Sequence, residues 1–351
     1  MSRRGERAPQ RESPSPRSVR FRAEIGPVPA RDRSQTVSRS VESAGLPVSA
    51  LDRYELRRDV RAAARCLAAA GVASADNDAR LLAEHVLGAP LLLADGASPD
   101  FSEHYEALIA RRERREPLQH ITGVMWFRGR ELVSRPGVFI VRPETEVVAG
   151  AAIEAARQMI ADGAAPLVVD LCAGSGAIAA ALACEVPEAH VVAVEVDEAA
   201  AALARENCRR LAPGRVEVVR GDATDARVLN DLDGCVDVVV SNPPYVPAGA
   251  VEDVETARYD PDRALFGGGE DGLAVPRAVV RRAAGLLRPG GVLIMEHDPR
   301  QSEELRDAAL TAGFTMAETG RDLAGRDRYL RAERGARRPF SSIPGSGTRL
   351  S

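Results

Sequence analysis

The segment SNPPYVP, residues 241–247, carries residue types that suit the transfer of a group to a planar nitrogen. The nitrogen of an amide or an aromatic amine is a poor nucleophile because its lone pair is delocalised into the neighbouring π system. Two acceptors that hold its hydrogens direct this lone pair toward an electrophile. The side-chain oxygen of Asn242 and the backbone carbonyl of Pro243 are two such acceptors.

The prolines and the tyrosine of this segment fit the same chemistry. Pro243 and Pro244 each fix φ and restrict the preceding residue, which stiffens the carbonyl groups. Tyr245 offers a ring that can stack on a planar substrate group. We therefore expect Asn242, Pro243, Pro244 and Tyr245 to be the catalytic residues, although the motif alone also fits a rigid turn after a strand.

A glycine-rich segment, VVDLCAGSGAIAAALA at residues 168–183, indicates a bound ligand. Gly174 and Gly176 allow a sharp turn and a close approach of the backbone, and the helix that follows directs its amino end at the same place. Asp170 lies at the end of the preceding strand. An ordinary strand-to-helix turn is the alternative for this segment taken alone.

Two acidic residues follow at the ends of the next two strands. Glu195 ends VVAVE and is placed to accept the two hydroxyls of a ribose, and Asp222 in RGDATD is placed beside an adenine amino group. The spacing of Gly174, Gly176 and Glu195 also fits a dinucleotide-binding fingerprint, so NAD-linked redox chemistry is an alternative. Both interpretations imply an adenosine ligand. The Asn-Pro-Pro-Tyr segment has no evident use in a dehydrogenase, and it favours methyl transfer from S-adenosylmethionine.

Alternating strands and helices position these residues. From about residue 145 the sequence predicts strands at 167–171, 191–196, 216–220, 236–240 and 291–296, and helices near 176–186, 198–211, 272–287 and 302–312. This alternation indicates an α/β fold with a mostly parallel sheet covered on both faces. Because the carboxyl ends of parallel strands meet at one edge, the ligand is expected there.

The residues before this region have a different pattern. Apolar residues at helical spacing predict helices at 51–71, 76–88 and 101–116, which together form a small helical bundle. Residues 117–140 are β-rich and punctuated by turns, and they predict a hairpin that links the bundle to the α/β part.

The overall composition limits the class of protein. With 351 residues, of which 45% are hydrophobic, the chain is long enough for two domains of a soluble globular protein. It shows no membrane span and no secretory signal, so a cytoplasmic location is expected. Its five cysteines are odd in number and never form a C-x-x-C pair, which argues against a zinc site or a disulfide framework.

Charge is distributed unevenly along the chain. Residues 1–48 carry a net charge of +5 and residues 331–351 a net charge of +4, which leaves −13 for residues 49–330. Both ends are poor in large apolar groups and are expected to be disordered. A nucleic-acid-binding tail at the amino terminus is the alternative to a dispensable extension. The acidic central part is a poor binder of phosphate backbones.

Taken in order, the motifs VVDLCAGSGAIA, VEVD, GDATD and VVSNPPYVP resemble those of the protein-(glutamine-N5) methyltransferases that modify peptide chain release factors. REPLQHITGVMWFRG, FIVRPETEVV, ALFGGGEDGL and LLRPGGVLIMEH resemble the same family, and the resemblance covers roughly residues 50–332. It implies a Rossmann-like domain with a seven-stranded methyltransferase sheet, preceded by a small helical domain and a β-hairpin linker. It also implies methyl transfer from S-adenosylmethionine to the glutamine N5 of the Gly-Gly-Gln motif in class 1 release factors.

The site residues of that family carry over motif by motif. The donor-binding residues that the resemblance implies are Asp170, Cys172, Gly174, Ser175, Gly176, Glu195, Asp222, Ala223, Asn242 and Thr145. Asn242 to Tyr245 would grip the glutamine amide, and RPETE at 142–146 would lie against the donor and the entrance. The sequence departs from the family at 172–173, where Gly-Thr is common, and at EHD, residues 296–298. Neither change removes an expected contact.

The expected domain boundaries follow from these patterns: a disordered extension at 1–48, a helical substrate-binding domain at 49–116, the hairpin linker at 117–140, the methyltransferase domain at 141–332 and a disordered tail at 333–351. We expect a monomer with a release factor as partner, an open cleft beside Asn242 lined partly by the helical domain, no metal and no specific nucleic-acid binding. Two alternatives stay open. One is an amino methyltransferase acting on adenine, cytosine or guanine in nucleic acid, and the other is a redox or non-catalytic adenosine-binding protein.

Overall fold

The structure is a computed structural model, and it describes residues 50–161, 163, 165–251 and 253–335. The extension expected at 1–48 lies outside the described residues, as does the tail from residue 336 onward. Glu333 and Arg334, which the sequence assigns to that tail, instead belong to the last strand of the sheet, because they pair with Met316 and Phe314 of the neighbouring strand.

The amino-terminal part is a bundle of helices, as the sequence predicts. It contains β1 (Leu51–Asp52), α1 (Arg53–Ala69), α2 (Ala75–Leu87), η1 (Leu91–Leu93), β2 (Gly96–Ala97) and α3 (Phe101–Glu113). Asp52 starts α1 with a capping box, in which its carboxylate accepts from Glu55 N and the Glu55 side chain accepts from Asp52 N. The three helices enclose an apolar core of their own that includes Leu56 and Phe101.

The linker differs from the hairpin predicted for 117–140. It begins with a short helix, α4 (Leu118–Thr122), and only then forms the hairpin of β3 (Val124–Phe127) and β4 (Arg130–Val133). Pro117 precedes α4 with a φ of −56°, which suits the start of a helix. Leu118 and Ile121 lie one turn apart and pack against the bundle core, so tertiary packing favours a helix here.

A seven-stranded sheet forms the remaining part, in the order β10-β11-β9-β8-β5-β6-β7. Its strands are β5 (Leu167–Leu171), β6 (His190–Glu195), β7 (Val216–Arg220), β8 (Val236–Ser241), β9 (Leu287–Glu296), β10 (Phe314–Arg321) and β11 (Asp327–Arg334). The pairs among β5 to β9 are parallel, whereas β10 and β11 run antiparallel at one edge. The α/β class and the mostly parallel sheet are therefore confirmed.

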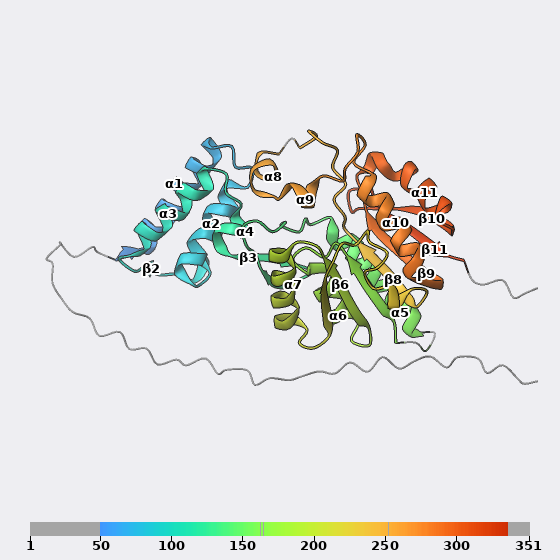
Figure 1. The fold of residues 1–351 in the computed structure, drawn as a ribbon. Coiled ribbons are helices and arrows are strands. Elements are labelled where there is room, and N and C mark those ends of the chain that lie inside the picture. Colours follow the sequence, from blue (N-terminus) through green and yellow to red (C-terminus); the bar gives the residue numbers. More distant parts are fainter. Residues whose placement is uncertain (1–49, 162, 164, 252, 336–351) are drawn as a thin grey trace, which may run out of the picture. The chain divides into compact units, whose positions relative to one another are not determined.

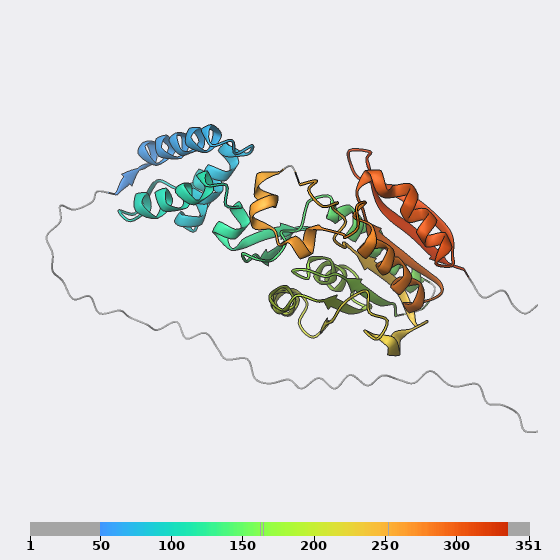
Figure 2. The same cartoon turned by 45° about the horizontal axis from the view of Figure 1, so that its top comes forward.

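Helices cover both faces of the sheet (Figures 1 and 2). On one face lie α5 (Thr145–Ala161), α6 (Ala177–Glu185) and α7 (Glu198–Leu211), and on the other lie α10 (Ala274–Leu286) and α11 (Ser302–Thr311). Val168 and Val240 belong to the first core, and their neighbours Val169 and Val239 belong to the second. Successive strand residues thus face different apolar layers, which explains why apolar residues occupy consecutive positions in the central strands.

An insertion follows β8 and is not predicted by the sequence pattern. It contains α8 (Val254–Tyr259) and α9 (Asp262–Leu265), and Figure 1 shows both helices outside the sheet layers. The backbone ties the insertion to the loop after β8, because Val246 N donates to Leu265 O over 2.8 Å and Gly267 N donates to Val246 O over 3.1 Å. The insertion is therefore joined directly to the Asn-Pro-Pro-Tyr loop.

Ion pairs also connect the insertion to the helical bundle. Arg112 of α3 is buried and pairs with both Asp78 and Glu255 at 2.8 Å, and Arg115 pairs with the same Glu255 carboxylate. A buried charge is costly unless it is paired and hydrogen-bonded, so removal of one partner here is strongly destabilising. These pairs link α8 to the helical bundle.

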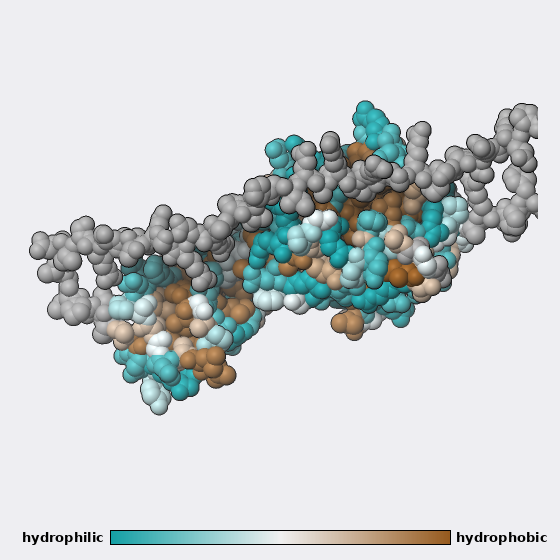
Figure 3. Space-filling model, turned by 90° about the horizontal axis from the view of Figure 1, so that it is seen from below, coloured by the Kyte–Doolittle hydropathy of each residue, from teal (hydrophilic) through white to brown (hydrophobic). Residues whose placement is uncertain are grey.

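Large apolar side chains remain exposed on several elements. Figure 3 shows one face of the molecule, where hydrophobic areas are separated by hydrophilic ones. The exposed large hydrophobic residues of the described part are Tyr54, Leu92, Leu93, Trp126, Val196, Val254, Leu310 and Leu323. None of the described helices is long and apolar enough to cross a lipid bilayer.

Candidate active site

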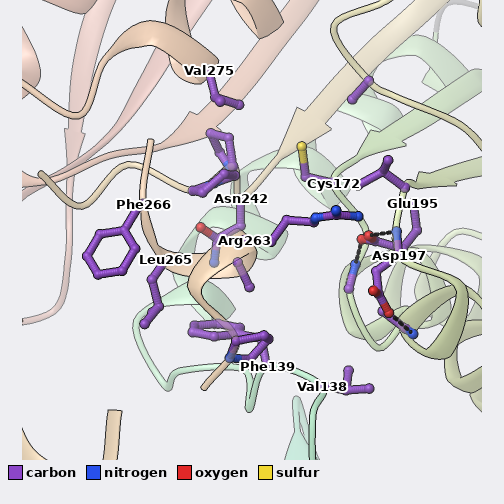
Figure 4. A pocket seen from close by; sticks show the side chains of 18 of the residues that line it. Val138, Phe139, Cys172, Glu195, Asp197, Asn242, Arg263, Leu265, Phe266 and Val275 are labelled. Atoms are coloured by element: carbon purple, nitrogen blue, oxygen red, sulfur yellow. Dashed lines mark hydrogen bonds between the residues drawn. The ribbon is translucent and has the colours of Figure 1, made fainter. Parts of the chain in front are cut away.

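A cavity of about 510 Å³ opens where β5, β6, β7 and β8 end (Figure 4). Its wall is built from the residues that follow these strands, together with residues 137–139 after the hairpin and residues 261–266 around α9. β5 lies between β6 and β8, so the order of the strands reverses at β5. Such a switch point is where α/β sheets bind ligands. The volume lies in the range of about 300–1,000 Å³ that is usual for small-molecule sites.

Glu195 lies at the end of β6, and the backbone holds its carboxylate from two sides. Oε2 accepts from Gly174 N over 2.7 Å, and Oε1 accepts from Asp197 N over 2.8 Å. Gly174 has a φ of +55°, so a side chain there would strain the turn that aims this N–H at Glu195. A fixed carboxylate at the cavity wall retains lone pairs that can accept two neighbouring hydroxyls, such as those of a ribose.

Asp222 follows β7 on the same cavity. Its Oδ1 accepts from the backbone N of Thr224 over 2.8 Å and from the Thr224 hydroxyl over 2.7 Å, and this turn orients the carboxylate. Ala223, Leu265 and Phe266 add apolar wall. Apolar surface with a carboxylate beside it suits a purine that carries an exocyclic amino group.

Asn242 follows β8 and lines the cavity, and its amide is anchored from behind. Nδ2 donates to Oγ1 of Thr145 over 3.2 Å, and Thr145 is only 1% exposed. This bond leaves Oδ1 as the acceptor that Asn242 offers to a ligand. The Pro243 carbonyl is a second such acceptor, because none of the described residues donates a hydrogen bond to it. The loop therefore presents two acceptors on adjacent residues.

Tyr245 lines the cavity, and its hydroxyl reaches a buried carboxyl. Oη donates to Oε1 of Glu296 over 3.1 Å, and burial together with the nearby Glu296 raises the pKa of Tyr245 far above its usual value. Tyr245 thus stays protonated and does not act as a base. The Tyr245 carbonyl accepts from Nε2 of Gln301 over 2.8 Å, which fixes the end of the loop.

The cavity brings together most of the residues predicted from the sequence. The predicted catalytic residues Asn242, Pro243, Pro244 and Tyr245 all line it. The predicted donor-binding residues that line it are Cys172, Gly174, Glu195, Asp222, Ala223 and Asn242. Cys172 lies in the turn after β5, and burial raises the pKa of its thiol, so the thiol is not an activated nucleophile.

Four predicted donor-binding residues do not line the cavity but lie beneath its wall: Asp170, Ser175, Gly176 and Thr145. Asp170 is the first example. It is fully buried, and its Oδ2 accepts from Ala179 N over 3.0 Å, so it holds α6 from beneath the glycine turn. Burial raises the pKa of Asp170 to about 8. Ser175 is buried, and its carbonyl accepts from Asn207 Nδ2 of α7 over 3.0 Å. A Cβ at Gly176 would lie 3.0 Å from Ala204 Cα of the same helix. Thr145 contacts Asn242 as described above.

Sequence reasoning missed one side of the cavity. The lining residues that it did not identify are Gly137, Val138, Phe139, Val194, Val196, Asp197, Ala200, Thr224, Val246, Pro261, Arg263, Ala264, Leu265, Phe266 and Val275. Arg263 reaches from α9 into the cavity (Figure 4). The motif ALFGGGEDGL at 264–273 was the available signal, because an apolar pair ahead of three glycines indicates a closely packed segment.

The helical bundle does not contribute to this cavity within the described ranges, contrary to the expectation for residues 49–116. Residues 137–139 and α9 form that side of the wall instead. The described part of the chain also holds no group of three or more His, Cys, Asp or Glu side chains that could bind a metal ion.

Two family models match the chain. The PrmC N-terminal domain matches residues 60–123, which cover most of the helical bundle and α4. The methyltransferase small domain matches residues 130–258, which contain the glycine turn, Glu195, Asp222 and the Asn-Pro-Pro-Tyr loop.

Curated proteins named release factor glutamine methyltransferase are similar over nearly their whole length. The protein of Mycolicibacterium smegmatis is 46% identical over 286 residues, which are 80% of this chain and 99% of that protein. The protein of Streptomyces coelicolor is 49% identical over 253 residues, or 71% of this chain and 87% of that protein. The protein of Mycobacterium tuberculosis strain H37Rv is 40% identical over 299 residues, or 83% of this chain and 95% of that protein.

Proposed function

This chain belongs to the release factor glutamine methyltransferase family, and we propose that it transfers a methyl group from S-adenosylmethionine to a glutamine side-chain nitrogen of a peptide chain release factor. The proposed target is the glutamine of the Gly-Gly-Gln motif, so a release factor is the proposed protein partner. The net charge of −13 over residues 49–330 supports a protein substrate over a nucleic acid.

The cavity contains groups that can bind S-adenosylmethionine, the methyl donor. When bound, S-adenosylmethionine supplies an activated methyl group on a sulfonium, so the amide nitrogen needs no general base before attack. Glu195 is fixed by Gly174 N and Asp197 N and can accept from the ribose hydroxyls. Asp222 and the apolar residues beside it suit the adenine. These residues bind and orient the donor and take no part in the proton balance.

Asn242 and Pro243 hold the substrate nitrogen. The Asn242 Oδ1 and the Pro243 carbonyl accept its two N–H hydrogens, which turns the nitrogen lone pair toward the methyl group. The prolines stiffen this clamp, and the ring of Tyr245 lines the cavity next to it. As the new N–C bond forms, the bond between the methyl carbon and the sulfonium sulfur would break and release the neutral thioether, and one N–H hydrogen would then leave as a proton to water. Holding reactants in this way supplies about 7–11 kcal/mol of a barrier in well-oriented reactions.

One observation carries the proposal: Asn242 Nδ2 donates to Thr145 Oγ1, while the same residue lines the cavity. Because one N–H of the amide is held by Thr145, the orientation of the amide is fixed, and Oδ1 stays available to accept a hydrogen bond from a ligand. Two hydrogen-bond acceptors beside a cavity for the methyl donor fit a substrate with two N–H hydrogens, such as the primary amide of glutamine.

The test is the mass of a class 1 release factor after incubation with this protein and S-adenosylmethionine. We expect one added methyl group, which peptide fragmentation places on the glutamine of Gly-Gly-Gln. A release factor with that glutamine replaced by alanine is the control and should gain nothing. If the intact factor also gains nothing while the donor binds, the proposed substrate is wrong.

A second arm separates protein from nucleic acid as the substrate. A chain that lacks residues 1–48 has lost a segment with a net charge of +5, which is the feature that supports a nucleic-acid substrate. We expect this shortened chain to methylate the release factor at the wild-type rate. Methylation of nucleic acid that depends on residues 1–48 would favour the alternative.

A further inference from the structure

The wall of the cavity contains a cationic side chain that the proposed function does not yet use. Among the described residues that line the cavity, Arg263 of α9 is the only basic one, and the acidic ones are Glu195, Asp197 and Asp222. Arg263 is exposed, and Figure 4 shows its side chain extending from α9 into the cavity. Its guanidinium makes no ion pair or hydrogen bond with the described residues. It is therefore available to a ligand.

Two hydroxyl groups and an amide also lie in the wall, and each already donates to the protein. The Thr224 hydroxyl donates within its own turn over 2.7 Å, and the Tyr245 hydroxyl donates to Glu296 over 3.1 Å. Nδ2 of Asn242 donates to Thr145 over 3.2 Å. These side chains therefore offer an anionic ligand much less than the five N–H groups of a free guanidinium.

The glycine turn after β5 also uses backbone N–H groups internally. Ala173 N donates to Val194 O over 3.0 Å, and Gly174 N donates to the Glu195 carboxylate over 2.7 Å. A carboxylate that leaves water for the cavity needs hydrogen-bond donors or a cation, because an uncompensated charge is costly to desolvate. Arg263 is the group of the wall that meets this need.

We propose that Arg263 binds the carboxylate in the amino-acid group of S-adenosylmethionine. This inference rests on the proposed function, which assigns the donor to this cavity. The carboxylate is the one anionic group of the donor, and Glu195, Asp197 and Asp222 would repel it unless a cation compensates. A guanidinium can bind both oxygens of a carboxylate through two parallel N–H groups, which a point charge cannot do.

The place of Arg263 in the chain supports this assignment. The amino-acid group and the methyl group of the donor are bonded to the same sulfur. The amino-acid group must therefore lie near the Asn-Pro-Pro-Tyr loop when the methyl group faces the substrate nitrogen. Leu265, two residues after Arg263, accepts at its carbonyl from Val246 N over 2.8 Å. This backbone contact holds α9 beside that loop.

Donor binding to Arg263→Met tests the assignment, because methionine keeps an apolar stem and removes the charge. We expect the Kd of S-adenosylmethionine, measured by calorimetry on the full chain, to rise by about 10-fold. S-adenosylhomocysteine keeps the carboxylate, so its Kd should rise by a similar factor. The donor as a whole carries a net positive charge, which a distant arginine repels. A loss of affinity on removal of Arg263 therefore indicates a local contact with the carboxylate.

A ligand without the carboxylate is the decisive comparison. Decarboxylated S-adenosylmethionine keeps the adenosine, the sulfonium and the amine. The wild type should bind it about 10-fold more weakly than S-adenosylmethionine, and Arg263→Met should bind it no more weakly than the wild type does.

Arg258→Met is the matched protein control. Arg258 of α8 is also exposed and forms no ion pair within the described ranges, but it does not line the cavity. Its substitution should leave the Kd of all three ligands unchanged. Both variants replace exposed side chains, so the thermal midpoint without ligand should stay at the wild-type value.

Each contrary result has a distinct meaning. An unchanged Kd of S-adenosylmethionine in Arg263→Met would overturn the inference, and so would an equal rise for all three ligands, because Arg263 would then act on the shape of the cavity. A wild-type donor Kd with a raised KM for the release factor would also overturn it, because Arg263 would then contact the protein substrate. The expected pattern of Kd values without methylation of the release factor would refute the proposed function alone.

Discussion

Gly267 is packed between two backbone segments of the site, so a substitution there is expected to displace the Asn-Pro-Pro-Tyr loop. A Cβ at Gly267 would lie 1.8 Å from Gly272 O and 2.8 Å from Pro244 O, whereas real Cβ atoms essentially never come within 3.0 Å of such atoms. Both neighbours are backbone, so no change of rotamer relieves the contact. One segment must move, and Pro244 belongs to the Asn-Pro-Pro-Tyr loop.

The expected effect of Gly267→Ala follows from this distance. Relief of the contact with Gly272 O requires a shift of about 1 Å. Gly272 is packed in turn against the backbone of Tyr245 and Pro247, so this shift is passed to the Asn-Pro-Pro-Tyr loop, where a misplacement of that size costs about 100-fold in rate. Forcing an extra methyl group into a packed site also lowers the free energy of unfolding by about 1–3 kcal/mol. We therefore expect kcat on the release factor to fall by about 100-fold and the thermal midpoint to fall, as measured by methyl transfer and calorimetry.

Gly285→Ala is the matched control for this change. Gly285 lies in α10, and a Cβ there would meet Arg282 Nη1 at 3.0 Å and no backbone atom within 4 Å. This guanidinium is buried and pairs with Asp233, so it must shift by a few tenths of an ångström. Alanine is favoured over glycine inside a helix by about 1 kcal/mol, which offsets the cost of that shift, so this variant should keep its activity. If Gly267→Ala retained wild-type kcat and thermal midpoint, the argument from backbone contact would be refuted.

Three further predictions concern the donor site, the clamp and the buried acids. Asn242→Ala should lower kcat by at least about 100-fold with little change in the donor Kd measured by calorimetry, and a large rise in Kd would contradict the clamp. Glu195→Ala should weaken donor binding by about 10-fold or more, because it removes the ribose acceptor and frees Gly174 N; unchanged binding would refute this role. The free energy of unfolding should fall as pH rises between about 4 and 8, because folded Asp170 and Glu296, with pKa values raised to about 8 and about 7, keep protons that the unfolded chain releases. Asp170→Asn should flatten that slope in urea unfolding at several pH values, and an unchanged slope would contradict it.

The strands and their terminal residues could be predicted from the sequence because the signals are local. Val238 to Val240 are three consecutive apolar residues, and such a run favours a strand that is covered on both faces. Once the sheet is parallel, the ends of its strands must share one edge, so Glu195, Asp222 and Asn242 were expected to meet. The cavity confirms that they do.

Other features depend on contacts between distant residues. Asp170 and Glu195 are both acids near the ends of strands, yet one lies beneath the glycine turn and the other lines the cavity. α8 and α9 are too short for a clear helical period, and ion pairs and backbone bridges to other segments fix their place.

The sequence by itself thus determined the alternation of β5 to β9 with α6, α7, α10 and α11, the glycine turn and the types of residue at each strand end, because these depend on neighbours in the chain. Only the tertiary structure decided which acids line the cavity, that α9 forms part of its wall, and that Thr145 anchors Asn242 rather than lining the wall. The physical reason is that burial and hydrogen-bond partners are set by how layers pack. The type of a single residue does not specify which side chain of another element will contact it.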